Sequence, residues 1–269
     1  MVKIGCSSLF FWEYDIGEIV DIFLEIGLKN MEFFPENPEF WKKRNDLDYI
    51  NNVKTELSKL DVTIHAPYIE LNSSSTNENI RLVTLMETFW AIDLSKKFKS
   101  ELLTIHPGKR PTARIPTDEE YNNFDDYLEK SINYALKNEI TLCLENSPKK
   151  INNICYNVES MKKTLDKFEN LYMTLDIAHA RENSRDFIKN FHEKIKNMHI
   201  SGVNSKDHYP LSESRINFDE TLNSLLNEYK YQGALNFELN DLIYNKTLLK
   251  QEKIDIIINE VQYLEKIIE

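Results

Sequence analysis

Short apolar segments alternate with longer amphipathic segments along all 269 residues of this chain. The apolar segments have few polar interruptions, which is typical of parallel strands covered on both faces. They span residues 3–6, 30–34, 62–65, 102–106, 140–145, 171–176, 196–200 and 234–239. The amphipathic segments, with apolar residues at helical spacing, span residues 16–26, 48–59, 79–98, 119–137, 158–168, 218–228 and 248–268.

Eight strand–helix alternations are compatible with a closed barrel or with an open doubly wound sheet. Repeating units of roughly 30 residues favour the barrel, which typically needs about 250 residues. No shift in composition marks a linker between two domains. The sequence therefore predicts an α/β fold, a (β/α)8 TIM barrel formed by one domain over residues 1–269.

The net charge and the hydropathy of the chain limit the kinds of partner that it can bind. The chain has 33 basic and 44 acidic residues, a net charge of −11, which argues against nonspecific binding to nucleic acid. It has no apolar run of about 18 residues and no signal-peptide pattern at its start, so we expect a cytoplasmic protein without membrane spans. Its three cysteines, Cys6, Cys143 and Cys155, show no paired spacing and predict neither disulfides nor a cysteine zinc site.

The histidines are concentrated where the predicted strands end. His65, His106 and His199 lie at the ends of their strands, and His179 and His208 lie in the segments that follow the sixth and seventh strands. The carboxyl ends of barrel strands and the loops after them form the catalytic face of such folds. A lone histidine at a strand end is more often structural than a ligand. The sixth histidine, His192, is predicted to be in the middle of a helix and exposed.

Acidic residues occupy equivalent positions. Glu145, Asp176 and Glu238 each follow an apolar run, where a charge is costly unless it is paired or bound to metal. Together with the histidines they would repel one another or share protons unless a cation lay among them. The sequence therefore predicts a divalent-metal site, with Zn or Mn favoured and Co or Mg as alternatives. The predicted ligands are Glu145, Asp176, His199 and Glu238, with His65, His106, His179 and His208 as further candidates.

At these residues the chain resembles the xylose isomerase-like barrel superfamily, which includes sugar and sugar-phosphate isomerases and epimerases and the endonuclease IV-type abasic-site nucleases. The resemblance extends through segments 63–68, 105–108, 144–148, 175–180, 198–201, 208–211 and 236–238. It implies that Glu145, Asp176, His199 and Glu238 form the metal site that both groups share. It also implies that His65 and His106 match further nuclease zinc ligands, and that His179 and His208 match two ligands of the third nuclease zinc.

The sequence departs from the nuclease pattern at the third zinc. That pattern is Asp-x-His, and aligning its histidine with His208 puts Lys206 in place of the aspartate, while Asp207 has the wrong spacing. Ser-Glu-Ser at residues 212–214 also replaces the usual Gly-Glu-Gly. The resemblance therefore favours a metal-dependent isomerase or epimerase over a three-zinc nuclease.

An isomerase of this kind acts by proton transfer through a metal-stabilised ene-diolate. The resemblance implies that Glu145 and Glu238 remove and return the proton. We expect a small sugar or sugar phosphate as substrate, and the chain could pair as a homodimer. The candidate substrate-binding residues are His65, His106, His179, Lys206 and Trp12, the last because aromatic rims often pack on sugar rings.

Two other functions stay open at this point. An abasic-site endonuclease would use several zinc ions and bind DNA, and Lys109, Arg110 and Arg114 form a small basic cluster that could meet backbone phosphates. A non-catalytic barrel that only binds a ligand is the third alternative.

Overall fold

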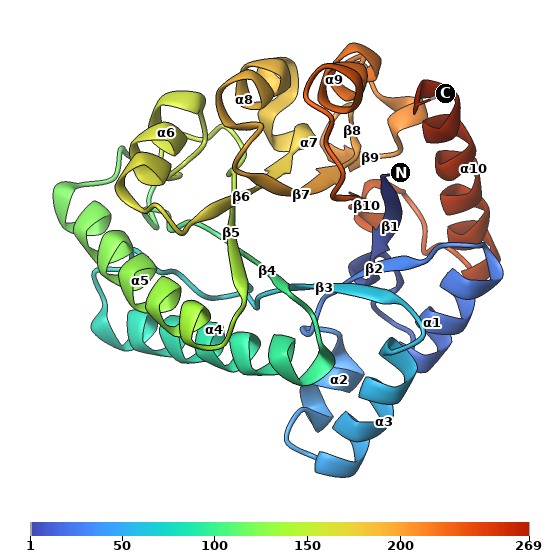
Figure 1. Cartoon of the computed structure of the whole chain (residues 1–269), viewed down its shortest axis with the longest axis horizontal. Coiled ribbons are helices and arrows are strands. Elements are labelled where there is room, and N and C mark those ends of the chain that lie inside the picture. Colours follow the sequence, from blue (N-terminus) through green and yellow to red (C-terminus); the bar gives the residue numbers. More distant parts are fainter. Residues whose placement is uncertain (1, 269) are drawn as a thin grey trace.

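The computed structural model describes residues 2–268 and shows a closed barrel of eight parallel strands with helices around it (Figure 1). The strands are hydrogen-bonded in the order β1-β10-β7-β6-β5-β4-β3-β2. Their bounds are β1 Lys3–Ser7, β2 Asn30–Phe33, β3 Asp61–His65, β4 Leu102–Ile105, β5 Thr141–Glu145, β6 Tyr172–Asp176, β7 Ile195–Ile200 and β10 Ala234–Phe237. The predicted (β/α)8 barrel is confirmed, and each of the eight strands ends within two residues of its expected bounds.

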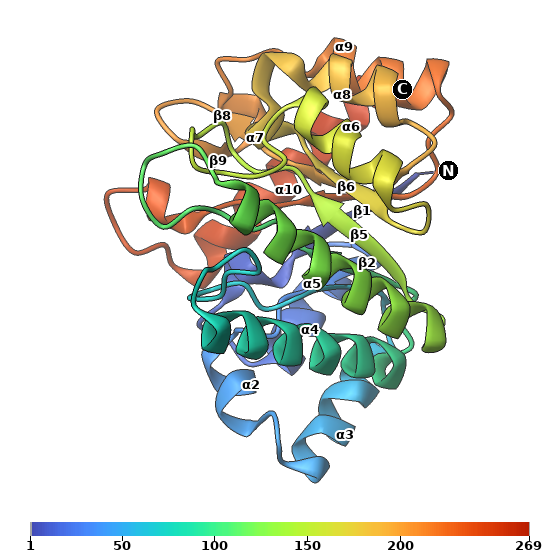
Figure 2. The ribbon, with the colours of Figure 1, turned by 90° about the vertical axis from the view of Figure 1, so that its left-hand side faces the viewer.

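Helices cover the outside of the barrel, as Figures 1 and 2 show from two sides. They are α1 Ile16–Glu25, α2 Pro38–Lys43, α3 Leu47–Leu57, α4 Glu78–Phe98, α5 Asp118–Lys137, α6 Val158–Lys167, α8 Ser184–Phe191, α9 Asp219–Asn223 and α10 Lys250–Ile268. The short helix α7 Ile177–Ala180 is instead buried directly after β6, at the carboxyl end of the barrel. The helix predicted over residues 218–228 is divided into α9 and a π-helical segment, Ser224–Glu228. Helices α2, α7 and α8 were not predicted.

The prediction for His192 was wrong in two respects. The residue follows α8 as its C-terminal cap, so it is not in the middle of a helix. Its ring is half-buried against the ring of Tyr229, with 4.4 Å between centroids. Helix α8 ends here because the chain turns directly into β7.

Local signals in the sequence explain where the long helices begin. Asp15 caps α1, and Glu18 completes the capping box by accepting from the Asp15 backbone. Thr117 and Glu120 form the same arrangement at the start of α5. Each such cap contributes about 1 kcal/mol, because it satisfies backbone N–H groups that the helix leaves free. These caps fix the point at which the loops above the barrel turn back toward its outer layer.

The interior of the barrel contains a buried polar network. Asn30 donates to Asn236 Oδ1 at 2.6 Å, Asn236 donates to Asn197 Oδ1 at 2.9 Å, and Asn197 donates to Glu32 Oε1 at 3.0 Å. A Cβ atom on Gly5 would lie 2.4 Å from both the Asn30 and the Asn236 side chains, so only glycine allows β1 to approach this network. The network joins the three strands β2, β7 and β10 beneath the catalytic end of the barrel.

A small antiparallel hairpin, β8 Gly202–Val203 and β9 Asp207–Tyr209, follows β7 and was not predicted. The three cysteines are buried and none forms a disulfide. No helix within residues 2–268 is both long and apolar enough to cross a membrane.

Candidate metal centre

Four predicted ligands meet at the carboxyl end of the barrel, and we call them the central group. Glu145 and Asp176 end β5 and β6, His199 lies in β7, and Glu238 directly follows β10. Each offers one ligand atom, and these atoms all lie within 4.8 Å of one another. The side chains of Glu145, Asp176 and His199 are at most 1% exposed, and that of Glu238 is 13% exposed. The pairing of Asp176 with His199 in neighbouring strands places both at the same height.

Each residue of the central group has a donor atom that makes no hydrogen bond. Glu145 Oε1, Asp176 Oδ2, His199 Nδ1 and Glu238 Oε2 are all buried and form no hydrogen bond with any described residue. His199 Nδ1 lies 2.9 Å from Glu238 Oε2 and 3.4 Å from Glu145 Oε2, in contact but outside hydrogen-bond geometry. Three buried carboxylates cost several kcal/mol each unless opposite charge compensates them. The donor set therefore fits a divalent cation.

The electrostatics of the central group agree with this fit. Burial would lower the pKa of His199, but Glu238, Glu32 and Glu145 raise it well above its ordinary value. Burial raises the pKa of Glu145, but His106, His199 and His179 together lower it well below its ordinary value, so the carboxyl group stays ionised. Burial raises the pKa of Asp176 to about 6, against the effect of His179. Protons on the imidazoles thus provide the positive charge that a cation would provide.

Sequence reasoning missed Glu32. This residue lies within β2, is 1% exposed, and places its Oε2 atom 2.5 Å from His199 Nε2. Thr104 and Asn197 donate to its other oxygen at 3.2 and 3.0 Å. A carboxylate behind a ligand histidine fixes the ring and leaves its other nitrogen for a metal. Glu32 therefore directs His199 Nδ1 into the central group. The sequence did contain one signal for Glu32, namely an acidic residue inside an otherwise apolar strand.

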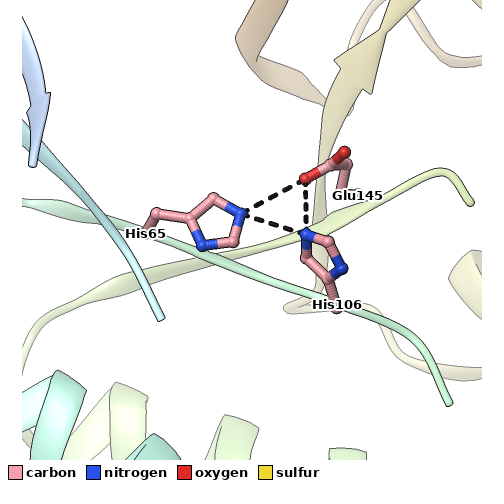
Figure 3. A group of neighbouring side chains, drawn as sticks. All are labelled: His65, His106 and Glu145. Atoms are coloured by element: carbon pink, nitrogen blue, oxygen red, sulfur yellow. Dashed lines mark hydrogen bonds and ion pairs between the residues drawn. The ribbon is translucent and has the colours of Figure 1, made fainter. Parts of the chain in front are cut away.

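A second set, the β3–β4 group, consists of His65, His106 and Glu145 (Figure 3). His65 Nε2 lies 3.1 Å from His106 Nε2 and 3.4 Å from Glu145 Oε2, and His106 Nε2 lies 3.1 Å from the same oxygen. His65 Nδ1 donates to the Ala66 carbonyl at 2.8 Å, so its Nε2 presents a lone pair. The ring of Tyr68 stacks on His106 with 4.1 Å between centroids. Glu145 connects this group to the central group.

The third set, the hairpin group, consists of Asp176, His179 and His208, again with ligand atoms within 4.8 Å. His179 Nδ1 contacts the Asn146 carbonyl at 2.9 Å and Glu145 Oε1 at 3.1 Å. Because of Asp176 and Glu145, and despite burial, the pKa of His179 is raised to about 10. The β8–β9 hairpin brings His208 to this position, although its backbone adopts a positive φ of 66°.

The residues that replace the nuclease aspartate do not join the hairpin group. Lys206 is exposed at the tip of the hairpin. Asp207 forms an ion pair with Arg181 at 2.8 Å. The hairpin group therefore has one carboxylate, Asp176, which it shares with the central group.

A cavity of about 410 Å³ opens beside the three groups. His106, His179, His208 and Glu238 line it, together with the loops after β3, β4 and β5. Trp12, which is 40% exposed, and Lys206 are not among the lining residues. Their roles in substrate binding, like that of His65, stay predictions.

Relatives of the chain cover all or part of its length. An uncharacterised protein of Methanocaldococcus jannaschii (MJ1188) is 49% identical over 271 residues, which is 100% of both chains. A protein described as probable endonuclease 4, from Petrotoga mobilis, is 26% identical over 178 residues, 61% of this chain and 59% of that protein. The second match thus spans little more than half of the nuclease-like protein.

Solved structures share the fold. A D-tagatose 3-epimerase-like protein superposes with a TM-score of 0.80 at 24% identity, covering 99% of this chain and 98% of that one. A D-psicose 3-epimerase from Clostridium cellulolyticum H10 superposes with a TM-score of 0.83 at 15% identity, covering 100% of both. The family model described as xylose isomerase-like TIM barrel matches residues 20–266. The chain belongs to the xylose isomerase-like TIM barrel family.

Proposed function

We propose that the chain is a metal-dependent isomerase or epimerase of sugars or sugar phosphates, carried by one domain over residues 1–269. The observation that carries this proposal is the central group, whose four residues each offer a ligand atom within 4.8 Å of the others and each have a buried donor atom without a hydrogen bond, with Glu238 also lining the cavity. The epimerase names of the structural neighbours agree with it. Zn or Mn suits this mixture of carboxylates and imidazole, with Co or Mg as alternatives.

A cation held by Glu145, Asp176, His199 and Glu238 would act as a Lewis acid toward a carbonyl oxygen and the neighbouring hydroxyl of the substrate. Glu145 and Glu238 are the proposed bases, one removing the proton from the shared carbon and the other returning it. His106 and His179 line the cavity and can orient the hydroxyl groups of the sugar.

Proton exchange gives a direct test. Ketoses and their phosphates would be incubated with the metal-loaded protein in D2O, and deuterium at the exchanged carbon would be measured by NMR. We expect Glu145→Gln and Glu238→Gln to lower exchange by about 10²- to 10⁴-fold at saturating metal. Asp207→Asn, which alters only the ion pair with Arg181, is the matched control. Full exchange in both glutamine variants would contradict the proposed roles.

The second candidate is an endonuclease IV-type abasic-site nuclease acting on DNA. Its support is the presence of all three ligand groups and the likeness to probable endonuclease 4 proteins. Against it are the ion pair that holds Asp207 outside the hairpin group and the net charge of −11. Cleavage of a duplex with one abasic site, together with about three zinc ions per chain, would favour this candidate.

A further inference from the structure

The cavity beside the central group has a lining of mixed charge. Carboxylate and imidazole groups line it where it meets the metal centre, whereas the loops after β4 and β5 contribute Lys109 and Lys150. Both lysines are exposed, and within residues 2–268 neither ammonium group has an ion-pair partner. Two uncompensated positive charges on one cavity wall attract an anion.

The loops that carry these lysines are held in place by several contacts. The Asn72 side chain accepts from Lys109 N at 3.1 Å and donates to Lys109 O at 2.8 Å. An antiparallel bridge joins Lys109 to Asn153 in the loop after β5. A Cβ atom on Gly108 would lie 2.3 Å from Ser74 Oγ, so the loop after β4 packs directly on the loop after β3. The wall is therefore preformed.

Ser73, in the loop after β3, lines the same cavity and is 3% exposed. Its hydroxyl group is buried and forms no hydrogen bond within the described chain. A buried hydroxyl without a partner is unfavourable, and such groups occur where a ligand or a water molecule supplies the partner. Ser73 thus packs within the wall that carries the two lysines, and its buried hydroxyl group is not itself exposed to the cavity.

We propose that Lys109 and Lys150 form an anion subsite that binds the phosphate group of a phosphorylated sugar. This inference rests on the proposed function and names its substrate class. A phosphate monoester carries about −1.5 to −2 charges at pH 7, which matches two ammonium groups, and its oxygens accept hydrogen bonds from them. The carbonyl end of the same molecule then faces the central group, which the same cavity reaches through Glu238.

The other basic residues near the rim do not take this role. Arg110 donates to the Ile115 carbonyl at 2.9 Å and lies 3.9 Å from Glu120. Arg114 and Lys206 are exposed and are not among the lining residues. The phosphate position is therefore assigned to the loops after β4 and β5.

Calorimetric titration of the metal-loaded protein with inorganic phosphate tests the subsite without any catalytic readout. The test variant is Lys109→Ala/Lys150→Ala, and the control is Arg114→Ala/Lys149→Ala, which removes the same charge at exposed residues outside the lining. We expect the test variant to bind phosphate at least tenfold more weakly, roughly the effect of losing one charge-assisted hydrogen bond. The control should bind phosphate as the natural protein does.

Equal phosphate affinity in the natural protein and the test variant would overturn the subsite, because the anion would then bind the metal alone. Equal weakening in test and control variants would also overturn it, as a general charge effect.

Kinetics with paired ketoses and ketose phosphates separate this inference from the proposed function. Turnover of unphosphorylated ketoses without lysine-dependent phosphate binding removes the subsite and leaves the proposed function. Lysine-dependent phosphate binding without turnover of any ketose keeps the subsite and removes the proposed function. Cleavage of an abasic duplex that depends on the two lysines would mean that they bind the DNA backbone, and it would overturn the inference.

Discussion

The central group and the hairpin group share Asp176 yet differ in how completely they are built. Three of the four side chains in the central group are at most 1% exposed, and Glu32 fixes the imidazole from behind. In the hairpin group, the His208 side chain is 20% exposed and its loop contributes no further carboxylate. Strands position the first group, whereas a short hairpin positions part of the second. The comparison indicates one group with a full set of four candidate metal ligands and less complete groups beside it.

The largest effect is expected from removing a ligand of the central group. Glu145→Ala should weaken metal binding on the order of 10²- to 10³-fold, which is about one ligand's share of the 10–16 kcal/mol typical of a four-ligand zinc site. Metal content after dialysis, measured by elemental analysis, checks this. Glu36→Gln is the control, since Glu36 is a half-buried acid that accepts from the Tyr68 and Ile69 backbones. Normal metal content in Glu145→Ala would remove the basis of the comparison.

A smaller effect on metal affinity is expected from replacing Glu32, which contacts the ligand His199 but is not itself a ligand. Glu32→Gln should weaken metal affinity by about 10- to 100-fold, because the orientation of His199 is no longer fixed by a carboxylate. Thr104→Val is the matched control: it removes a hydrogen bond to the other Glu32 oxygen and leaves the contact with His199. Competition with a metal-binding dye measures both affinities. Equal losses in the two variants would show that Glu32 acts through general packing.

Metal affinity should also rise with pH. The pKa of His199 is well above its ordinary value and that of His179 is about 10, so both imidazoles are protonated at neutral pH in the metal-free protein. A metal must displace the His199 proton, so affinity should increase about tenfold per pH unit for each proton released. Competition titrations at pH 6, 7 and 8 measure the slope. A flat profile would mean that the metal does not bind through His199.

The smallest effect is expected in the hairpin group. His208→Ala should leave metal affinity within about threefold, because the central group supplies a full set of four ligands without it. Elemental analysis should still find about one ion per chain. Loss of a bound ion in this variant would make the two groups equivalent and would move the abasic-site nuclease ahead of the isomerase.

The strands could be predicted from the sequence because parallel barrel strands are buried on both faces and therefore consist of runs of apolar residues. Helix α8 was missed since its eight residues, Ser184–Phe191, lie close before β7 and the segment is short. The central group could be predicted because its acids and its histidine lie at or near strand ends, where topology alone brings them together. Glu32 was missed because it lies within its strand, where that rule does not apply.

The cavity wall could not be predicted in the same way. Its shape depends on contacts between loops that are far apart in the chain, such as Asn72 with Lys109 and Lys109 with Asn153. No periodic pattern encodes such contacts. Lys150 was therefore not singled out in the sequence, and the roles of Trp12 and Lys206 stay predictions. A homodimer and a cytoplasmic location stay predictions as well.

The central group has one donor on each of β5, β6 and β7 and one directly after β10. An ion bound by all four would connect the ends of strands that are distributed over the second half of the chain. Because it would bind the folded state and not the unfolded chain, the ion would stabilise that half of the barrel by mass action. Strands β1–β4 carry none of these four donors. Loss of the ion would then loosen the molecule unevenly, and the amount of intact barrel in a cell would depend on metal supply as well as on sequence.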